Sequence, residues 1–258
     1  MEWKQFLQNK SQLFKSNYAR APIYAKVVTH RLTPFLVFVC INLKLRPTQV
    51  TALSLLVGWA AAFCFTIPSP EMVLLSALLL ESYYVLDSVD GQLARMTGQS
   101  SKTGAFFDIL LNYLVHPLIF IGIGVGQSKL NGTPYPLLAG AVCALAYIWL
   151  GAMWNVRAHV LFESLPARLE RKAEGGEKEK QETARALFSF LHKLCTFPTL
   201  MNLITLTSLL AVFTRNLGFL NYLLGFYSVV LPFVSLGKIA KMILAHEPDR
   251  EYESYSRD

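Results

Sequence analysis

Charged side chains are scarce in this sequence. Asp, Glu, Lys and Arg together make up 16% of its 258 residues, whereas hydrophobic residues make up 53%. Soluble domains of average composition carry about 25% charged residues, so the scarcity excludes an ordinary soluble domain. The composition instead predicts a protein with much of its surface in lipid.

Cysteines are also few, and none forms a CxxC pair. Four occur, all within or beside apolar runs: Cys40, Cys64, Cys143 and Cys195. Neither a disulfide framework nor a cysteine metal site is expected from this pattern. The charged N-terminus, residues 1–22, lacks a short apolar core followed by a cleavage site, so we expect no cleaved secretory signal.

Long apolar runs are what the sequence does have. A helix needs about 20 apolar residues to cross the hydrocarbon core of a bilayer. Six runs of about that length predict an all-α integral membrane protein with six transmembrane helices, at roughly 48–66, 71–90, 105–126, 135–156, 196–214 and 217–237.

A further apolar run, residues 33–43, is too short to span and follows a basic segment. It predicts an interfacial amphipathic helix within an N-terminal cytoplasmic segment, residues 1–46. The transmembrane domain would then cover residues 47–245. A hydrophilic insert at 157–193 is expected to form a loop, partly helical, and residues 246–258 a cytoplasmic tail.

Basic residues are unevenly divided between the two ends of the predicted bundle. Six spans place both termini, the loop before the third span and the long insert on one side, and three short loops on the other. Of the 24 Lys and Arg residues, only Lys129 and Arg215 fall in those three loops. The first side is therefore predicted to be cytoplasmic. Basic flanks facing anionic lipid explain the net charge of +7 without nucleic acid.

Acidic residues gather near the cytoplasmic end of the second and third predicted spans. Asp87 and Asp90 are three residues apart, and Asp108 and Asn112 are four apart, so each pair shares a helix face. A short connection makes the two helices antiparallel, which predicts one cluster. Carboxylates packed together at the edge of the hydrocarbon repel one another, and a divalent cation would relieve this cost.

The donor atoms indicate which cation and which ligand to expect. Oxygen donors without His or Cys favour Mg²⁺, Mn²⁺ or Ca²⁺ over zinc. Mg²⁺ usually completes its shell with water and substrate phosphate, so a phosphate-bearing substrate is expected. Gly91, Ala94 and Gly104 lie one turn from the aspartates and leave room for a ligand, although small residues also serve helix packing.

Several polar residues near this cluster have plainer explanations. Glu81 suits a hydrogen-bonded structural role as well as a functional one, and His116 suits a satisfied interior histidine better than a ligand. Arg95 could extend to the interface or stand beside a diphosphate. Four basic residues could bind an anionic acceptor, but cytoplasmic flanks explain them more simply: Arg157, Arg168, Arg171 and Lys172.

The acidic stretch resembles the signature of a known family. Asp87-Ser-Val-Asp90-Gly91-Gln-Leu-Ala94-Arg95, eight residues, then Gly104-Ala-Phe-Phe-Asp108-Ile-Leu-Leu-Asn112 is similar to DxxDGxxARx8GxxxDxxxD of the CDP-alcohol phosphotransferases. Seven of the eight fixed positions match.

The resemblance implies an enzyme of phospholipid biosynthesis. In such an enzyme, a hydroxyl attacks the substituted phosphate of a CDP-alcohol, and CMP is released. The resemblance allows CDP-diacylglycerol with a soluble acceptor and equally a soluble CDP-alcohol with a lipid acceptor. It also implies a two-metal site with Mg²⁺ or Mn²⁺ and a homodimer. By this likeness Asp87, Asp90, Asp108 and position 112 would bind metal. The nucleotide site would be shaped by Gly91, Ala94, Arg95 and Gly104.

Position 112 departs from the pattern because it is Asn where the signature has Asp. The fourth aspartate would take the proton from the incoming hydroxyl, and an amide cannot do so. We therefore expect impaired turnover. Three explanations remain: an engineered replacement that holds substrate, which the near-isosteric change favours, a natural enzyme with another base, or a catalytically silent relative.

Two classes of function therefore stay open. One is the membrane transferase, and the other is a silent member of the family that binds a CDP-linked ligand or lipid. A channel or transporter fits less well, because the carboxylates cluster at one face and no broken helices meet at the midplane.

Overall fold

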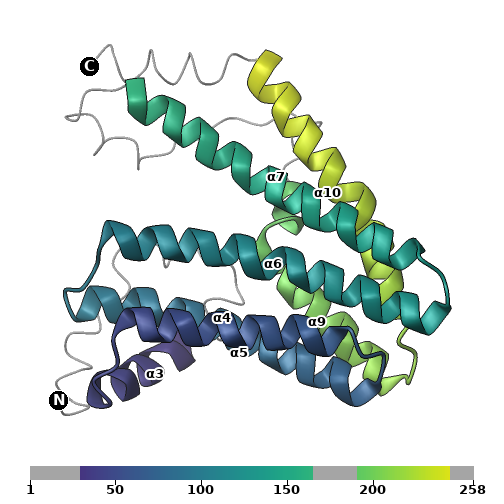
Figure 1. Ribbon diagram of the computed structural model, residues 1–258, viewed down its shortest axis with the longest axis horizontal. Helices are drawn as coiled ribbons and strands as arrows, with labels where there is room; N and C mark the ends of the chain where they lie inside the picture. Colours follow the sequence, from purple (N-terminus) through teal and green to yellow (C-terminus); the bar gives the residue numbers. More distant parts are fainter. Residues whose placement is uncertain (1–29, 165–190, 245–258) are drawn as a thin grey trace.

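The protein is built from helices, as the sequence predicts. The computed structural model describes residues 30–164 and 191–244, and within them it contains helices and no strand (Figure 1). The helices are α3 (His30–Asn42), α4 (Pro47–Phe65), α5 (Pro70–Met96), α6 (Lys102–Asn131), α7 (Tyr135–Ser164), α9 (Phe197–Phe213) and α10 (Phe219–Leu244). The N-terminal residues 1–29, the centre of the predicted insert and the predicted tail at 246–258 lie outside the described residues.

Among the residues that the structure describes, five helices are long and apolar enough to cross a membrane: α4, α5, α6, α7 and α10. The fifth predicted span, 196–214, corresponds to α9, an apolar helix of 17 residues, which is shorter than the usual length of about 20 residues and is not among the five. A count of six spans is therefore not confirmed. Large apolar side chains point outward from several helices, as expected for surfaces in lipid, including Phe63, Leu145, Trp149, Phe213 and Phe233.

Helix ends follow capping residues rather than the ends of the apolar runs. The Oγ of Ser101 accepts a hydrogen bond from the N–H of Gly104 (3.0 Å), which starts α6. Helix α5 continues to Met96, beyond its apolar run, and stops before Gly98, which has a φ of 67°. The connection between α5 and α6 is therefore short. Helix α7 runs to Ser164, so the predicted insert begins as a continuation of this helix.

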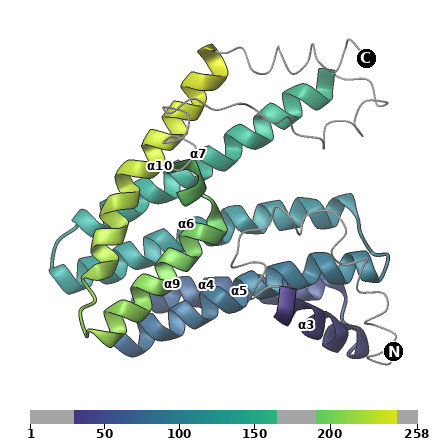
Figure 2. The same ribbon diagram turned by 180° about the vertical axis from the view of Figure 1, so that it is seen from behind.

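The helices alternate in direction through the bundle. In Figures 1 and 2 the α5–α6 connection lies at the same end as α3, and the α4–α5, α6–α7 and α9–α10 connections lie at the opposite end. Among the described connections, this arrangement separates the α5–α6 turn from the other three, as the sequence predicts. Helix α3 packs against α5, burying Val37 and Cys40 with Val85 and Val89. Its position at a membrane interface remains a prediction.

Helix α4 holds the bundle together because it packs against both α5 and α6. Glycines on α6 make this contact close. A Cβ added to Gly122 would collide with the carbonyl of Ala62, and one added to Gly126 with the carbonyl of Phe65. Small residues four apart allow such backbone approach between helices in membranes.

We expect the Gly122→Ala variant to be destabilised by about 1–3 kcal/mol, because the new methyl group must push α4 and α6 apart. The measurement is thermal unfolding in detergent. Gly225→Ala is the matched control, since Gly225 lies inside α10 and nothing stands within 4 Å of its added Cβ. Equal melting temperatures for the two variants would contradict the close α4–α6 contact.

Candidate active site

The capped turn between α5 and α6 brings the predicted acidic residues together. Asp87 and Asp90 lie near the end of α5, and Asp108 and Asn112 near the start of α6. The carboxyl groups of Asp87 and Asp108 come within hydrogen-bonding reach of each other. Deeper in the bundle α4 separates the two helices, with Gly58 packed between Tyr83 and Val115. The structure therefore places Asp87, Asp108 and Asn112 close together, which is part of the predicted cluster.

Asp90 differs from its neighbours because it faces α4. Its side chain is 6% exposed, and its Oδ2 accepts a hydrogen bond of 2.6 Å from the Oγ1 of Thr51. The guanidinium of Arg95, five residues along α5, attracts the same carboxylate. A Cβ added to Gly91 would stand 3.5 Å from that guanidinium, an ordinary van der Waals contact, so Gly91 lies directly beside it. Thr51 therefore fixes the orientation of Asp90.

Asn112 has partners for both ends of its amide. The Nδ2 group donates to the backbone oxygen of Asp108 (3.0 Å) and to its Oδ1 (3.3 Å). The Oδ1 atom accepts a hydrogen bond of 2.9 Å from the hydroxyl of Tyr83. The amino group, which cannot bind a cation, therefore faces the carboxylate pair.

His116 lies one turn further along α6 and is buried, with 3% of its surface exposed. Its Nε2 is 3.2 Å from the hydroxyl oxygen of Tyr83, and its Nδ1 is 2.7 Å from that of Tyr147. The ring of Phe197 stacks on the imidazole at a centroid distance of 3.3 Å and an angle of 13°. Helices α5 and α7 and the start of α9 thus hold this histidine, as expected for a satisfied interior residue.

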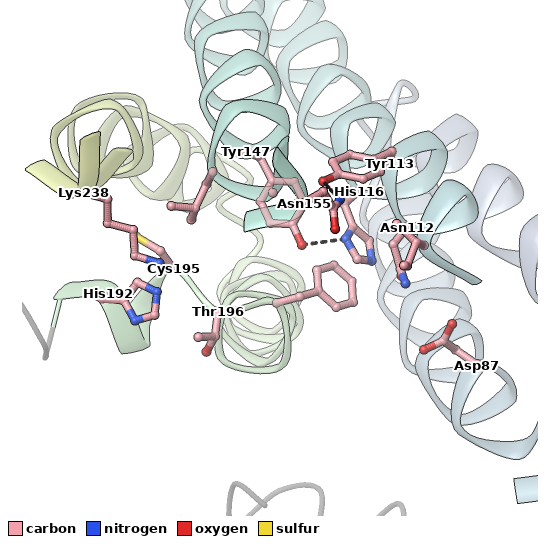
Figure 3. A pocket seen from close by; sticks show the side chains of 14 residues that line it. Asp87, Asn112, Tyr113, His116, Tyr147, Asn155, His192, Cys195, Thr196 and Lys238 are labelled. Atoms are coloured by element: carbon pink, nitrogen blue, oxygen red, sulfur yellow. Dashed lines mark hydrogen bonds between the residues drawn. The ribbon is translucent and has the colours of Figure 1, made fainter. Parts of the chain in front are cut away.

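A cavity of about 560 Å³ opens beside these residues, between α6, α7, α10 and the segment before α9 (Figure 3). Its lining is Asp87, Ile109, Asn112, Tyr113, His116, Tyr147, Leu150, Gly151, Asn155, His192, Cys195, Thr196, Phe197 and Lys238. A volume of this size accommodates a small molecule.

The two sides of the cavity differ in charge. Figure 3 shows Asp87 and Asn112 on one side and His192, Cys195 and Lys238 on the other. Burial and, to a smaller extent, the Lys238 ammonium hold the pKa of His192 below its ordinary value. The carboxylate of Asp87 and the ammonium group of Lys238 therefore lie on opposite sides of one cavity.

The other predicted site residues take different positions. Gly104 lies in the first turn of α6, and Ala94 and the exposed Arg95 lie near the end of α5. Neither these nor Gly91 line the cavity. Glu81 is half-buried on α5. Three of the basic residues considered for an acceptor, Arg168, Arg171 and Lys172, lie outside the described residues, whereas Arg157 is on α7.

The chemistry of the acidic residues fits a divalent cation. Carboxylate oxygens are the ligands that Mg²⁺ prefers, and Asp87 and Asp108 present them side by side. In the part of the chain that the structure describes, no three His, Cys, Asp or Glu side chains are gathered closely enough to hold an ion. Asp90 is held by Thr51, so the Asp87–Asp108 pair is the part of the cluster that already suits a metal.

Sequence reasoning missed several residues of this site: Thr51, Tyr83, Tyr113, Tyr147, Asn155, His192, Phe197 and Lys238. Only a weak pattern in the sequence marked these residues. Thr51 follows the helix-starting Pro47 by four residues, and Tyr83 lies one turn before Asp87. Tyrosine and threonine are common in apolar helices, so spacing alone does not single them out.

Comparison with known proteins agrees with the resemblance of the acidic stretch. The sequence model of the CDP-alcohol phosphatidyltransferase family matches residues 44–234. Archaetidylinositol phosphate synthase of Pyrococcus horikoshii is 33% identical over 85 residues, which are 33% of this chain and 44% of that protein. The bifunctional IPC transferase and DIPP synthase of Rubrobacter xylanophilus is 33% identical over 104 residues, 40% of this chain and 23% of that protein. The matched regions thus span less than half of each relative.

A solved structure shares the fold. The crystal structure of Mycobacterium tuberculosis phosphatidylinositol phosphate synthase with CDP-DAG bound superposes with a TM-score of 0.58. The alignment covers 81% of this chain and 92% of that chain at 15% sequence identity. At this sequence identity, the similarity shows that the two proteins share a fold.

Proposed function

This chain belongs to the CDP-alcohol phosphatidyltransferase family, and we propose that it binds a CDP-alcohol and transfers the substituted phosphate to an acceptor alcohol. The acceptor oxygen forms a bond to the β-phosphorus, the bond from that phosphorus to the bridging oxygen breaks, and CMP leaves. The hydroxyl proton passes to a base. The observation that carries the proposal is the approach of Asp87 and Asp108 beside a cavity.

Asp87 and Asp108, with Asp90 beside them, would hold Mg²⁺ or Mn²⁺, in a two-metal site by analogy with the family. A divalent cation neutralises charge on the diphosphate and on the leaving group. The protein would contribute the position of these carboxylates: Thr51 orients Asp90, and Asn112 orients Asp108. On the nucleotide side, Gly91, Ala94, Arg95 and Gly104 would line the approach to the diphosphate.

The cavity suits an acceptor that carries hydroxyl groups and one anionic group. Lys238 supplies a cation at one side, and Asp87 and Asn112 stand at the other, where the reacting hydroxyl would lie. Tyr113 and Asn155, which are hydrogen-bonded to each other at 2.6 Å, offer neutral polar groups between them. Two relatives are named as synthases of inositol phosphate lipids, which supports a polyol phosphate as acceptor.

Asn112 favours a second candidate, a silent family member that binds a CDP-linked ligand without turnover. The amide offers no basic site, and in this structure both its oxygen and its nitrogen are hydrogen-bonded. Because binding and proton transfer depend on different residues, a chain with Asn at this position could retain the first and lose most of the second.

The active site is proposed to face the cytoplasm, at the level of the lipid headgroups. A lipid-linked substrate and a soluble one could meet there. The support is the charge distribution, in which only two of the 24 Lys and Arg residues fall in the loops of the opposite end.

The first prediction is that CDP-diacylglycerol binds to the purified protein only when Mg²⁺ or Mn²⁺ is present, because the three aspartates alone would repel its diphosphate. Isothermal titration calorimetry with and without EDTA measures this. A variant with Ala at Asp87, Asp90 and Asp108 should lose metal-dependent binding. Binding that is independent of metal, or unchanged in that variant, would rule out the proposed site.

The second prediction is that Asn112→Asp raises the rate of CMP release by about 10² to 10⁴, the usual contribution of a general base. Affinity for the CDP-alcohol should change far less. The assay compares both chains at equal concentration in the same detergent, with a panel of alcohol acceptors that includes polyol phosphates. If the variant binds nucleotide but is no faster with any acceptor, the silent binding protein is the better account.

The third prediction concerns orientation. In a background without native cysteines, Ser100→Cys in the α5–α6 turn should resist a membrane-impermeant thiol reagent in intact cells and react after lysis. Ser100 suits this test better than Ser101, which caps α6. Asn131→Cys, at the other end of α6, is the matched control and should be labelled from outside. The reverse pattern would invert the proposed topology.

A further inference from the structure

A line of hydrogen bonds leads from the cavity to the carboxylate pair. It joins Tyr147, His116, Tyr83, Asn112 and Asp108, in that order, with donor-to-acceptor distances between 2.7 and 3.3 Å. Three helices contribute to it, since Tyr83 is on α5 and Tyr147 on α7. We call these five residues the relay.

The direction of the relay is fixed at its Asp108 end. Both Asp108 atoms that face Asn112, the backbone oxygen and Oδ1, are acceptors. The group that meets them must therefore be the amino group of Asn112, because the opposite orientation would set three acceptor oxygens against one another. The carbonyl oxygen of Asn112 then points at Tyr83, whose hydroxyl must donate to it.

The same logic fixes the tautomer of His116. The hydroxyl of Tyr83 has one hydrogen and gives it to Asn112, so its contact with His116 requires that Nε2 carries a hydrogen and donates. In a neutral imidazole the Nδ1 atom is then an acceptor, and it receives the hydroxyl hydrogen of Tyr147. Every hydrogen in the relay thus points toward Asp108.

The surroundings hold each member of the relay in place. Tyr83 is 1% exposed, and its ring meets the imidazole of His116 edge-on at 5.8 Å. Phe197 covers the face of that imidazole. If the hydrogen bonds of His116 served only to satisfy its own buried nitrogens, they would not need to connect to the carboxylates. This relay, in contrast, ends on the exposed side chain of Asp108.

We propose that Tyr83, His116 and Tyr147 are positioning residues that fix the amide of Asn112, and that Asn112 in turn holds the Asp108 carboxylate toward Asp87. Position 112 therefore acts in this chain as a hydrogen-bond donor. The consequence that we infer is the alignment of Asp108 for a metal and a CDP-alcohol. This consequence rests on the proposed function. The hydrogen-bond directions stand independently of that function.

The first test reads the tautomer of His116 in the unmodified protein. Solid-state NMR of ¹⁵N-histidine-labelled protein in lipid distinguishes a hydrogen on Nε2 from one on Nδ1, and the signal missing in His116→Gln identifies the residue. The relay requires the neutral form with hydrogen on Nε2. A hydrogen on Nδ1, or on both nitrogens, would overturn the inference.

The second test reads the effect on Asp108 through Mn²⁺ affinity, measured by electron paramagnetic resonance without any acceptor. Tyr83→Phe should weaken Mn²⁺ binding about three- to tenfold, the scale of one hydrogen bond, and Asn112→Ala should weaken it similarly. In the double variant the two losses should not add, because both break the same connection. Tyr227→Phe is the matched control, since Tyr227 is buried and donates to a backbone oxygen outside the relay.

The outcomes of these tests separate the inference from the proposed function. Additive losses, or a Tyr83→Phe effect no larger than that of the control, would show a structural role only and overturn the positioning role. If the unmodified protein binds no Mn²⁺, the proposed metal-dependent function fails. In that case the NMR measurement of the His116 tautomer alone tests the hydrogen-bond directions of the relay.

Discussion

The approach of two carboxylates, Asp87 on α5 and Asp108 on α6, is the constraint on which the rest of the site depends. Like charges at the edge of the hydrocarbon are costly, so the surrounding structure must hold them there. The turn capped by Ser101 sets the two helices antiparallel, and α4 packs against both of them. The close α4–α6 contact at Gly122 thus supports the position of the carboxylate pair at the far end of the bundle.

Neutral hydrogen-bonding groups complete this arrangement. Thr51 on α4 donates a hydrogen bond to Asp90, and the amide of Asn112 donates one to Asp108. The hydrogens that point at Asp108 reduce its repulsion with Asp87, and a divalent cation would reduce it further. In the proposed account, the near-isosteric amide at position 112 holds Asp108 by a hydrogen bond but cannot act as a general base. Binding of a charged diphosphate and loss of a general base are compatible in one chain.

The sequence predicted the helical class and the acidic cluster because both depend on local periodicity. Apolar runs placed the starts of the six predicted helices within three residues, and spacings of three and four placed each acidic pair on one face. Helix ends were less predictable: α5 extends to Met96 because its end is set by the turn, and α9 is shorter than its apolar run. The partners Thr51, Tyr83 and Tyr147 could not be predicted, since each meets the site only through packing between helices far apart in sequence.

The central claim is that the carboxylate pair is a metal site for a CDP-linked ligand, and the most direct measurement is crystallographic. Crystals grown with Mn²⁺ and CDP-diacylglycerol, with data collected at the manganese absorption edge, locate the ion without reference to catalysis. The account predicts an anomalous peak in contact with the carboxylates of Asp87 and Asp108, with the diphosphate beside it. Manganese bound elsewhere while the ligand occupies the cavity, or a ligand bound away from these carboxylates, would contradict it.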